Sequence, residues 1–255
     1  MSPAPDPAPT PSLADVRTRV ADVEGWLSDD QVQALHDAAR ACPPGGRIVE
    51  IGSFRGRSTI VLASSAPADV EVVAIDPHAG NDRGPQEIEG YEAEAEADNE
   101  VFRRNLDAAG VTDRVRHVRA FSDAAHGEVA DPIDVLFIDG AHRFGPARAD
   151  IRDWGRRVAP GGRMLIHDSF SSVGVTLAIL AELLVSGQWR YEGRAGSLTA
   201  YRRTRQSPRA RAVSALRQLA ELPWFVRNVL VKVLIVSGRR EWAKRLGHDG
   251  ETWPY

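Results

Sequence analysis

Cysteine is almost absent from this sequence of 255 residues, and Cys42 is the only one. No disulfide can form within the chain, so a reducing cytoplasm is the simplest compartment for it. Long hydrophobic runs are absent as well, because no apolar stretch approaches the roughly 20 residues that span a bilayer. Residues 1–11 carry five prolines among small residues and lack the basic start of a signal peptide, so we expect a disordered tail there.

The charge of the chain is unevenly distributed along its length. The formal net charge is −3, but residues 202–255 hold twelve Arg or Lys against four Asp or Glu. This basic end therefore carries +8, and the preceding residues carry −11. A hydrophobic content of 43% and a charged content of 26% are those of an ordinary globular protein, large enough for one α/β domain with appendages.

The most informative motif begins with residues 47–51, a short run rich in apolar and β-branched residues that suits a strand. Gly52 and Gly56 follow it, and a helix can start at Ser58. A second strand over residues 70–75 ends in Asp76. In a doubly wound sheet, a carboxylate at that place holds the ribose hydroxyls of a bound nucleoside.

The glycine spacing differs from that of dinucleotide-binding proteins. It is Glu-x-Gly-x-x-x-Gly rather than G-x-G-x-x-G, and the acidic residue is Glu50. A dinucleotide site brings a pyrophosphate to the helix N-terminus, whereas a glutamate at the strand's end suits a ligand with a cationic portion. A nicotinamide-dependent oxidoreductase is therefore a weaker interpretation than an enzyme with a cationic cofactor.

The remaining pattern alternates strands and helices and predicts a doubly wound, Rossmann-like α/β fold. Its seven-stranded mixed sheet would end in an antiparallel hairpin and carry helical N- and C-terminal extensions. The expected domain boundaries are 12–46 for N-terminal helices, 47–205 for the α/β domain and 206–255 for a basic, apolar extension. The further strands expected are 114–119, 133–138, 163–166, 189–193 and 198–202, and the helices 13–23, 29–42, 86–109, 145–158, 173–186 and 223–236.

Four ordered motifs resemble the class I S-adenosylmethionine-dependent methyltransferases, in the branch associated with sugar and natural-product O-methylation. They are Val-Glu-Ile-Gly at 49–52, Ile-Asp-Pro-His at 75–78, Phe-Ile-Asp-Gly-Ala-His at 137–142 and the run from Gly161 to Ser169. The resemblance covers roughly residues 47–203. It implies S-adenosylmethionine as cofactor and O-methylation of a hydroxyl on a small molecule or saccharide.

By the same resemblance, specific residues would hold the cofactor. Asp76 would bind the ribose, Ser122 or Asp123 the adenine edge, and Asp139 the amino group, although Ser122 and Asp123 could also cap a following helix. The methionine portion would lie in a cradle of four residues: Glu50, Gly52, Ser53 and Gly56.

Asp139 and Asp168 each follow a strand, and the two strands should be neighbours. Both carboxylates would then lie on one rim, within reach of a divalent ion such as Mg²⁺ or Mn²⁺. Catechol-type O-methyltransferases hold a metal in this way, with Asn or Asp directly after the second carboxylate. Ser169 occupies that position here, so the metal site is matched only in part.

His142 is the candidate catalytic base, with Asp139 and Asp168 as the other catalytic residues. It lies three residues after Asp139, where the catechol-type enzymes carry a lysine base. An imidazole with a pKa near 6.5 can accept a hydroxyl proton near neutral pH. His142 could instead cap a helix or bind Asp168, and we expect His167 to support Asp168 rather than react.

The extension contains an apolar helix over residues 223–236, bordered by arginine and tryptophan. We expect its apolar face to pack on the protein's own core or on a second subunit, forming a homodimer, ahead of an anionic membrane surface. No nucleic-acid-binding motif accompanies the basic residues, so no nucleic-acid partner is expected. A rival to the enzyme is a non-catalytic S-adenosylmethionine-binding module tethered by this tail.

Overall fold

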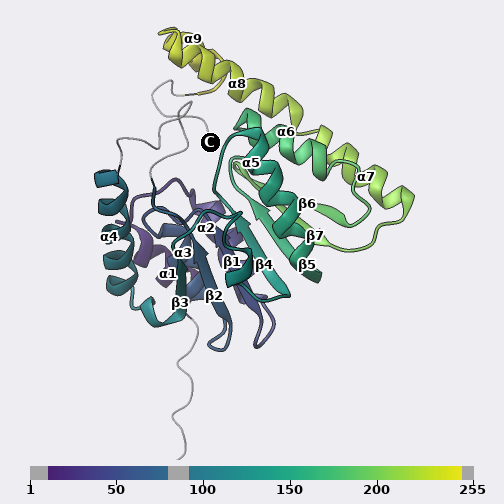
Figure 1. The fold of residues 1–255 in the computed structure, drawn as a ribbon. Helices are drawn as coiled ribbons and strands as arrows, with labels where there is room; N and C mark the ends of the chain where they lie inside the picture. The colour runs from purple at the N-terminus through teal and green to yellow at the C-terminus, as the bar shows by residue number, and fades with distance from the viewer. Residues whose placement is uncertain (1–10, 80–91, 249–255) are drawn as a thin grey trace, which may run out of the picture.

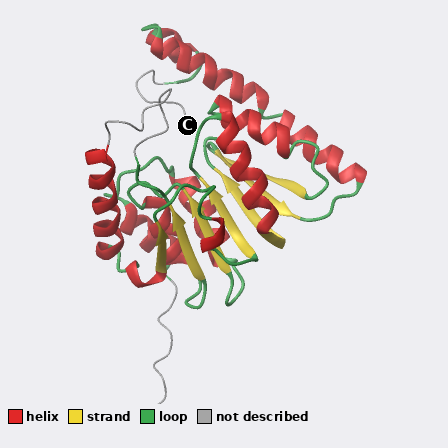
Figure 2. Cartoon of the chain, in the orientation of Figure 1, coloured by secondary structure: helices red, strands yellow, loops and turns green. Residues whose placement is uncertain are grey.

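The central feature of the computed structural model is a seven-stranded sheet in the order β3-β2-β1-β4-β5-β7-β6 (Figure 1). The structure describes residues 11–79 and 92–248. β7 runs antiparallel to both β5 and β6, and the other neighbouring strands are parallel. Helices cover both faces of the sheet (Figure 2). The predicted mixed seven-stranded α/β fold with a C-terminal hairpin is confirmed.

The strands and helices have the following bounds. The strands are β1 (Arg47–Ile51), β2 (Glu71–Ile75), β3 (Val115–Val118), β4 (Ile133–Ile138), β5 (Val158–Ile166), β6 (Trp189–Ala195) and β7 (Leu198–Arg203). The α-helices are α1 (Leu13–Val20), α2 (Asp29–Arg40), α3 (Arg57–Ser65), α4 (Glu92–Ala108), α5 (Phe144–Ala149), α6 (Val173–Glu182), α7 (Pro208–Leu219), α8 (Leu222–Val236) and α9 (Arg240–Arg245).

Alternation of side chains along the buried strands divides the core into two layers. Ile48 of β1 and Phe137 of β4 pack with α1, α2, α3 and α4 on one face. Val49 and Leu136, the adjacent residues in these strands, pack with α5 and α6 on the other. Because both faces are covered, the central strands are apolar at nearly every position, and the polar groups gather where the strands end.

The largest differences from the predicted boundaries concern three elements. β5 begins at Val158, five residues earlier than expected, because Val158 pairs with Ile133 before the register shifts at Pro-Gly-Gly and Arg163 pairs with Val135. The helix expected over 145–158 contains a π-helical turn, Asp150–Trp154, and a 3-10 turn. α6 ends at Glu182 rather than 186. The disordered tail expected at 1–11 and the first residues of the helix expected at 86–109 fall almost wholly outside the described residues.

The N-terminal helices α1 and α2 each begin after a serine N-cap. Ser28 and Gln31 form a reciprocal capping box at the start of α2. The Nε2 of Gln31 also donates a hydrogen bond to the hydroxyl of Ser197 at 3.0 Å, and that contact is buried. α2 is thereby attached to the turn between β6 and β7, at the edge of the sheet where the candidate site lies.

The start of the C-terminal extension is fixed to the last two strands by buried polar contacts. The backbone N–H of Tyr191 donates to the hydroxyl of Ser214 on α7 at 3.0 Å. The hydroxyl of Tyr201 donates to Oε1 of Gln218 at 3.1 Å. Tyr191, Tyr201, Ser214 and Gln218 are all almost fully buried. α7 therefore packs on this part of the protein's own core.

The rest of the extension continues this packing along α8. Leu222, Trp224 and Phe225 contact the core layer that holds α5 and α6. The guanidinium of Arg194 lies 3.9 Å from the ring centroid of Trp224 and pairs with Glu221 at 3.0 Å. Among residues 11–79 and 92–248, no helix combines the length and the apolarity needed to cross a bilayer.

We predict that Gln218→Ala lowers the free energy of unfolding by about 1–3 kcal/mol, because it leaves the buried Tyr201 hydroxyl without its acceptor and opens a cavity. Chemical denaturation followed by circular dichroism measures the change. Gln33→Ala, at an exposed position of α2, is the matched control and should stay within about 0.5 kcal/mol of the parent. Equal effects of the two changes would show that the Tyr201 contact does not hold α7 in place.

Candidate active site

A buried glutamate, Glu50, anchors the loop between β1 and α3 through hydrogen bonds. Oε2 of Glu50 accepts hydrogen bonds from the hydroxyls of Ser53, at 2.9 Å, and Thr59, at 2.5 Å. Burial raises the pKa of Glu50 to about 7, although the surrounding hydroxyls act in the opposite direction. Its second oxygen, Oε1, is buried without a hydrogen-bond partner among the described residues. Glu50 thus shapes the loop and keeps one oxygen for a further donor.

Gly52 brings this loop into contact with the end of β4. Its φ is +85°, and a Cβ added there would lie 2.2 Å from the carbonyl oxygen of Asp139. No side chain fits in that space, so the strand ends of β1 and β4 can meet only at glycine. Gly56, with φ +89°, is the residue before α3, and a Cβ there would press on the ring of Phe102.

Asp76 also takes part in this loop. One carboxylate oxygen accepts the backbone N–H groups of Ser53 and Phe54, each at 2.8 Å, and the other accepts the N–H of His78 at 2.7 Å. A ring nitrogen of His78 contacts the carbonyl oxygen of Phe54 at 2.8 Å. Asp76 thus fixes the loop that should cradle the cofactor, and its ribose contact stays a prediction.

The residues expected at the adenine edge lie after β3. The Ser122 hydroxyl donates to a carboxylate oxygen of Asp150 at 2.5 Å, and Asp123 is exposed beside it. Burial raises the pKa of Asp150 to about 6, with the hydrogen bond from Ser122 opposing that rise. No α-helix begins at either residue, since the next helical turn starts at His126. Asp150 lies in the π-helical turn, and nothing in the sequence pattern had marked it.

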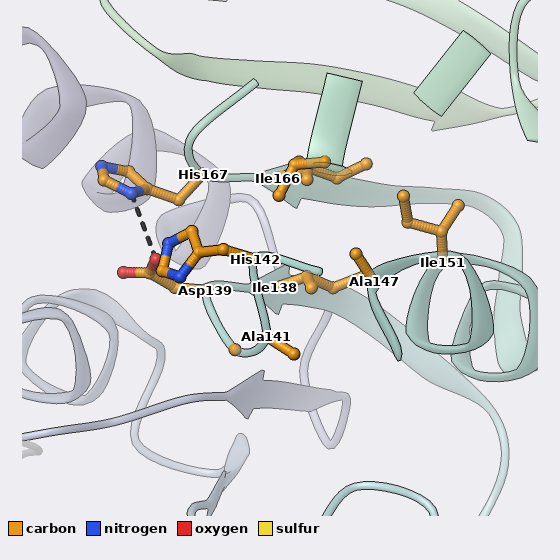
Figure 3. Close-up of a pocket in the computed structure, with 10 residues that line it drawn as sticks. Ile138, Asp139, Ala141, His142, Ala147, Ile151, Ile166 and His167 are labelled. Atoms are coloured by element: carbon orange, nitrogen blue, oxygen red, sulfur yellow. Dashed lines mark ion pairs between the residues drawn. The ribbon is translucent and has the colours of Figure 1, made fainter. Parts of the chain in front are cut away.

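The carboxyl ends of β4 and β5 bring together two acidic residues and two histidines, of which Figure 3 shows Asp139, His142 and His167. Asp139 follows β4, and its carboxylate lies 3.1 Å from Nδ1 of His167, which follows β5. Burial alone would lower the pKa of His167, but the Asp139 and Asp168 carboxylates outweigh it and raise that pKa to about 10. His167 is therefore a buried cation at neutral pH, placed beside Asp168, which the sequence predicted it to support, and also beside Asp139.

Asp168 is the partner of His142. Nε2 of His142 forms a short hydrogen-bonded ion pair with Oδ2 of Asp168. Burial would raise the pKa of Asp168, but the hydrogen bonds and charges of His142 and His167 hold it well below its usual range. One ligand atom each from Asp139, His142 and Asp168 lie within 4.8 Å of one another. These three predicted catalytic residues thus form one cluster.

Ser169 does not join this cluster. Its hydroxyl donates to the carbonyl oxygen of Ile166 at 2.8 Å and contacts the hydroxyl of Thr199 at 2.7 Å. Both contacts point into the sheet, away from the neighbouring Asp168. The position that supplies the third oxygen ligand in catechol-type enzymes therefore serves the pairing of β5 with β7 here.

Lys232 of α8 reaches the same region from the C-terminal extension. Its Nζ donates to the carbonyl oxygen of Ser171 at 2.9 Å and lies 3.2 Å from the Ser171 hydroxyl. Burial lowers the pKa of Lys232, and the charge of Asp168 opposes that effect. The sequence offered one signal for this residue, because Lys232 is the only charged side chain between residues 228 and 238.

Backbone strain gathers at these strand ends. Four non-glycine residues of the described chain have positive φ: Phe54 at 45°, His78 at 44°, Asp168 at 55° and Phe170 at 55°. Such residues cost of order 1–3 kcal/mol each and persist where their surroundings enforce them, which is common at functional sites. All four follow β1, β2 or β5, so the strain coincides with the proposed cofactor loop and the histidine–aspartate cluster.

Comparison with known proteins identifies the fold. Residues 49–169 match a protein-family model described as a methyltransferase domain. This segment of the chain is therefore similar to a methyltransferase domain. The matched segment begins in β1 and ends at Ser169, so it contains the glycine loop, Asp76 and the whole cluster around Asp168.

Three solved structures share the fold of this chain. The first is cofactor-bound Rv0187 from MTB, with 23% identity, 76% of this chain and 90% of that chain covered, and a TM-score of 0.53. The O-methyltransferase NovP is 19% identical, with 75% of this chain and 88% of that chain covered and a TM-score of 0.55. TomG is an O-methyltransferase from Streptomyces achromogenes involved in tomaymycin synthesis and was solved with SAM. It is 20% identical, with 75% of this chain and 87% of that chain covered and a TM-score of 0.51. At these identities the likeness concerns the fold.

The residues around the glycine loop fit a cofactor with a cationic methionine portion. The unpartnered Oε1 of Glu50 offers an acceptor beneath the loop, and the close approach at Gly52 leaves backbone rather than side chain at the surface of the turn. S-adenosylmethionine supplies such a portion. The structure thus brings Glu50, Gly52, Ser53, Gly56 and Asp76 together around one loop.

We predict that the stability conferred by His167 depends on pH. The folded pKa of about 10 lies above the ordinary value of 6.5, so the contribution is complete below about pH 6.5 and is lost as pH rises through 10. His167→Gln should lower the free energy of unfolding by on the order of a few kcal/mol at pH 6 and by much less at pH 10. Denaturation at pH 6, 8 and 10 measures the difference.

A second variant tests the cause of that pH dependence. Asp139→Asn keeps the size of the side chain but removes the carboxylate that lies nearest His167. It should flatten the difference between pH 6 and pH 10 as well. If either variant keeps the full pH dependence of the parent, His167 is not a buried cation.

Proposed function

We propose that this methyltransferase transfers the methyl group of S-adenosylmethionine to a hydroxyl oxygen of a small molecule or saccharide. The observation that carries the proposal is the hydrogen bond between His142 and Asp168, on the rim where β4 meets the glycine loop. A base held by a carboxylate is what a hydroxyl acceptor requires. NovP and TomG, whose titles name O-methyltransferases, are consistent with this choice of acceptor.

The proposed reaction is an in-line displacement at the methyl carbon. The acceptor oxygen attacks that carbon as the carbon–sulfur bond breaks, and the sulfonium becomes the neutral thioether of S-adenosylhomocysteine. The hydroxyl proton passes to the ring nitrogen of His142 that does not face Asp168. Asp168 then stabilises the imidazolium, and His167 keeps Asp168 ionised by adding positive charge on its other side.

A divalent metal is compatible with part of this cluster. Asp139, His142 and Asp168 would hold it, and the ion would polarise the acceptor's hydroxyl. Two carboxylates with one imidazole suit Mn²⁺ better than Mg²⁺, which prefers oxygen ligands and several waters. His167, with its raised pKa, already supplies positive charge beside both carboxylates. We therefore assign the base role to His142, in its neutral form, without a metal.

Two other functions remain to be separated by experiment. A non-catalytic module would bind S-adenosylmethionine without transferring its methyl group to any acceptor. A nicotinamide-dependent oxidoreductase would bind the dinucleotide instead. Calorimetry with both cofactors, followed by a screen of hydroxylated small molecules and saccharides for uptake of labelled methyl, distinguishes the three.

We predict that Asp76→Ala weakens S-adenosylmethionine binding by about 1–3 kcal/mol, because the charge-assisted hydrogen bonds of its carboxylate are lost. Isothermal titration measures the change. Asp69→Ala, at an exposed position before β2, is the control and should leave affinity unaltered. Unchanged affinity in the Asp76 variant would remove this carboxylate from the cofactor site, both as a ribose ligand and as the support of the loop.

We predict that His142→Gln lowers turnover by roughly 10²–10⁴-fold while cofactor affinity stays within a factor of about three, because only proton removal is lost. Asp168→Asn should lower turnover in the same direction by disturbing the orientation of the ring. The measurement is turnover at saturating acceptor between pH 6 and pH 9. As pH rises, more of the acceptor hydroxyl is ionised by the solvent. The difference in turnover between the His142 variant and the parent should therefore become smaller at high pH.

Chelation separates the base from a metal site in the same assay. Turnover that survives dialysis against a chelator agrees with His142 as the base. Turnover that is lost and then restored by Mn²⁺ would make His142 a ligand. Full turnover of His142→Gln at neutral pH would leave His142 as a structural partner of Asp168 only.

A further inference from the structure

Helix α8 has two faces with different surroundings. On one side Val231 and Asn228 are buried, with relative exposures of 0% and 1%, and Nδ2 of Asn228 donates to the carbonyl oxygen of Phe170 at 3.4 Å. Lys232 contacts Ser171 on the same side. Intramolecular packing therefore uses only one face of the helix.

The other face of α8 is apolar and exposed. Val226, Leu230 and Val233 lie at helical spacing along it and are exposed by 53%, 49% and 58%. Val236 at the helix end and Trp242 on α9 extend the surface and are also exposed. We call these five residues the α8–α9 face. Contiguous apolar surface of this kind is uncommon on a protein without a partner there.

Basic side chains border the α8–α9 face. Between Leu222 and Arg245 the chain holds six Arg or Lys and a single acidic residue, Glu241. Arg239 and Arg240 are exposed in the turn that joins the two helices. The guanidinium of Arg245 lies over the ring of Trp242, 4.4 Å from its centroid.

Hydrogen bonds hold α9 against α8. The Arg227 side chain on α8 donates to the carbonyl oxygens of Leu246 and Gly247, at 2.7 and 2.8 Å. Those carbonyls follow α9, so the end of α9 lies beside the first half of α8. In Figure 1 the two helices lie at the upper edge of the view, beyond α6 and at a distance from α4.

We propose that the α8–α9 face binds peripherally to an anionic lipid surface. The valines and Leu230 would enter the boundary between headgroups and acyl chains, and Trp242 would lie at the level of the headgroups. Arg239 and Arg240 would contact the acidic headgroups. The remainder of the chain, with a charge of −11 before residue 202, would be repelled by the same surface, which orients the protein with its C-terminal helices towards the lipid.

The charge distribution favours lipid over the other partners for such a face. A two-fold dimer would place the same basic surface against itself, and like charges at close range oppose that contact. The phosphates of a nucleic acid would pair with the arginines but would not bury the exposed valines and Leu230. An anionic bilayer complements both the charge and the apolar area.

The test is co-sedimentation of the full chain with vesicles of phosphatidylcholine alone or with 30% phosphatidylglycerol, a composition of about one anionic lipid in three. We expect binding to the mixed vesicles that falls at least tenfold in 0.5 M salt. Leu230→Gln combined with Val233→Gln should weaken it at least tenfold, and Arg239→Gln combined with Arg240→Gln by roughly tenfold. Unaltered circular dichroism and thermal unfolding show that the variants are folded.

Two control variants carry equal changes outside the face. Val185→Gln replaces another exposed valine, and Arg103→Gln with Arg104→Gln removes two exposed charges from α4. Both should bind vesicles like the parent. The proposal is overturned if the parent does not bind vesicles. It is also overturned if the control variants lose as much vesicle binding as the test variants. The parent could instead form a dimer in sedimentation velocity and fail to bind vesicles. If Leu230→Gln with Val233→Gln then dissociates that dimer, the face belongs to an interface with a second copy of the chain.

Discussion

The contact between Gly52 and the main chain of Asp139 is the constraint on which the site depends. A Cβ at residue 52 would lie 2.2 Å from the Asp139 carbonyl oxygen, so the ends of β1 and β4 meet only because the side chain is a hydrogen atom. This contact places the loop held by Glu50 and Asp76 beside the cluster that follows β4 and β5. Any larger residue would separate the two halves of the site or displace the loop.

Alternation of charge explains how the second half of the site holds so many ionisable groups. Asp139, His167, Asp168 and His142 follow one another in space, each acid beside a histidine. Removing any one of them would leave a buried charge without its partner, which costs more than the pair contributes. The network therefore fixes the rotamer and protonation of Asp168, and Asp168 in turn fixes the ring of His142.

The sequence was sufficient for the fold and for which residues reach the rim, because both follow from where apolar runs stop. Asp76 and Asp139 come directly after buried strands, Asp168 is the second residue after one, and parallel strands end at one edge. The sequence does not predict the direction in which a side chain points. Ser169 turns into the sheet because Thr199 of β7 offers a partner 30 residues away. Asp150 reaches Ser122 only through the π-helical turn, which no local pattern announces.

The C-terminal extension shows the same limit. Its apolar pattern predicts a helix whose apolar residues need to be buried. The sequence does not show which face of that helix packs on the core. The structure places Asn228, Val231 and Lys232 on the side towards Phe170 and Ser171, two or three residues beyond Asp168. The surface left outside is therefore the opposite face of the helix that contacts Phe170 and Ser171. Since a helix is only about 10 Å across, whatever covers that face lies within about one helix diameter of these two residues.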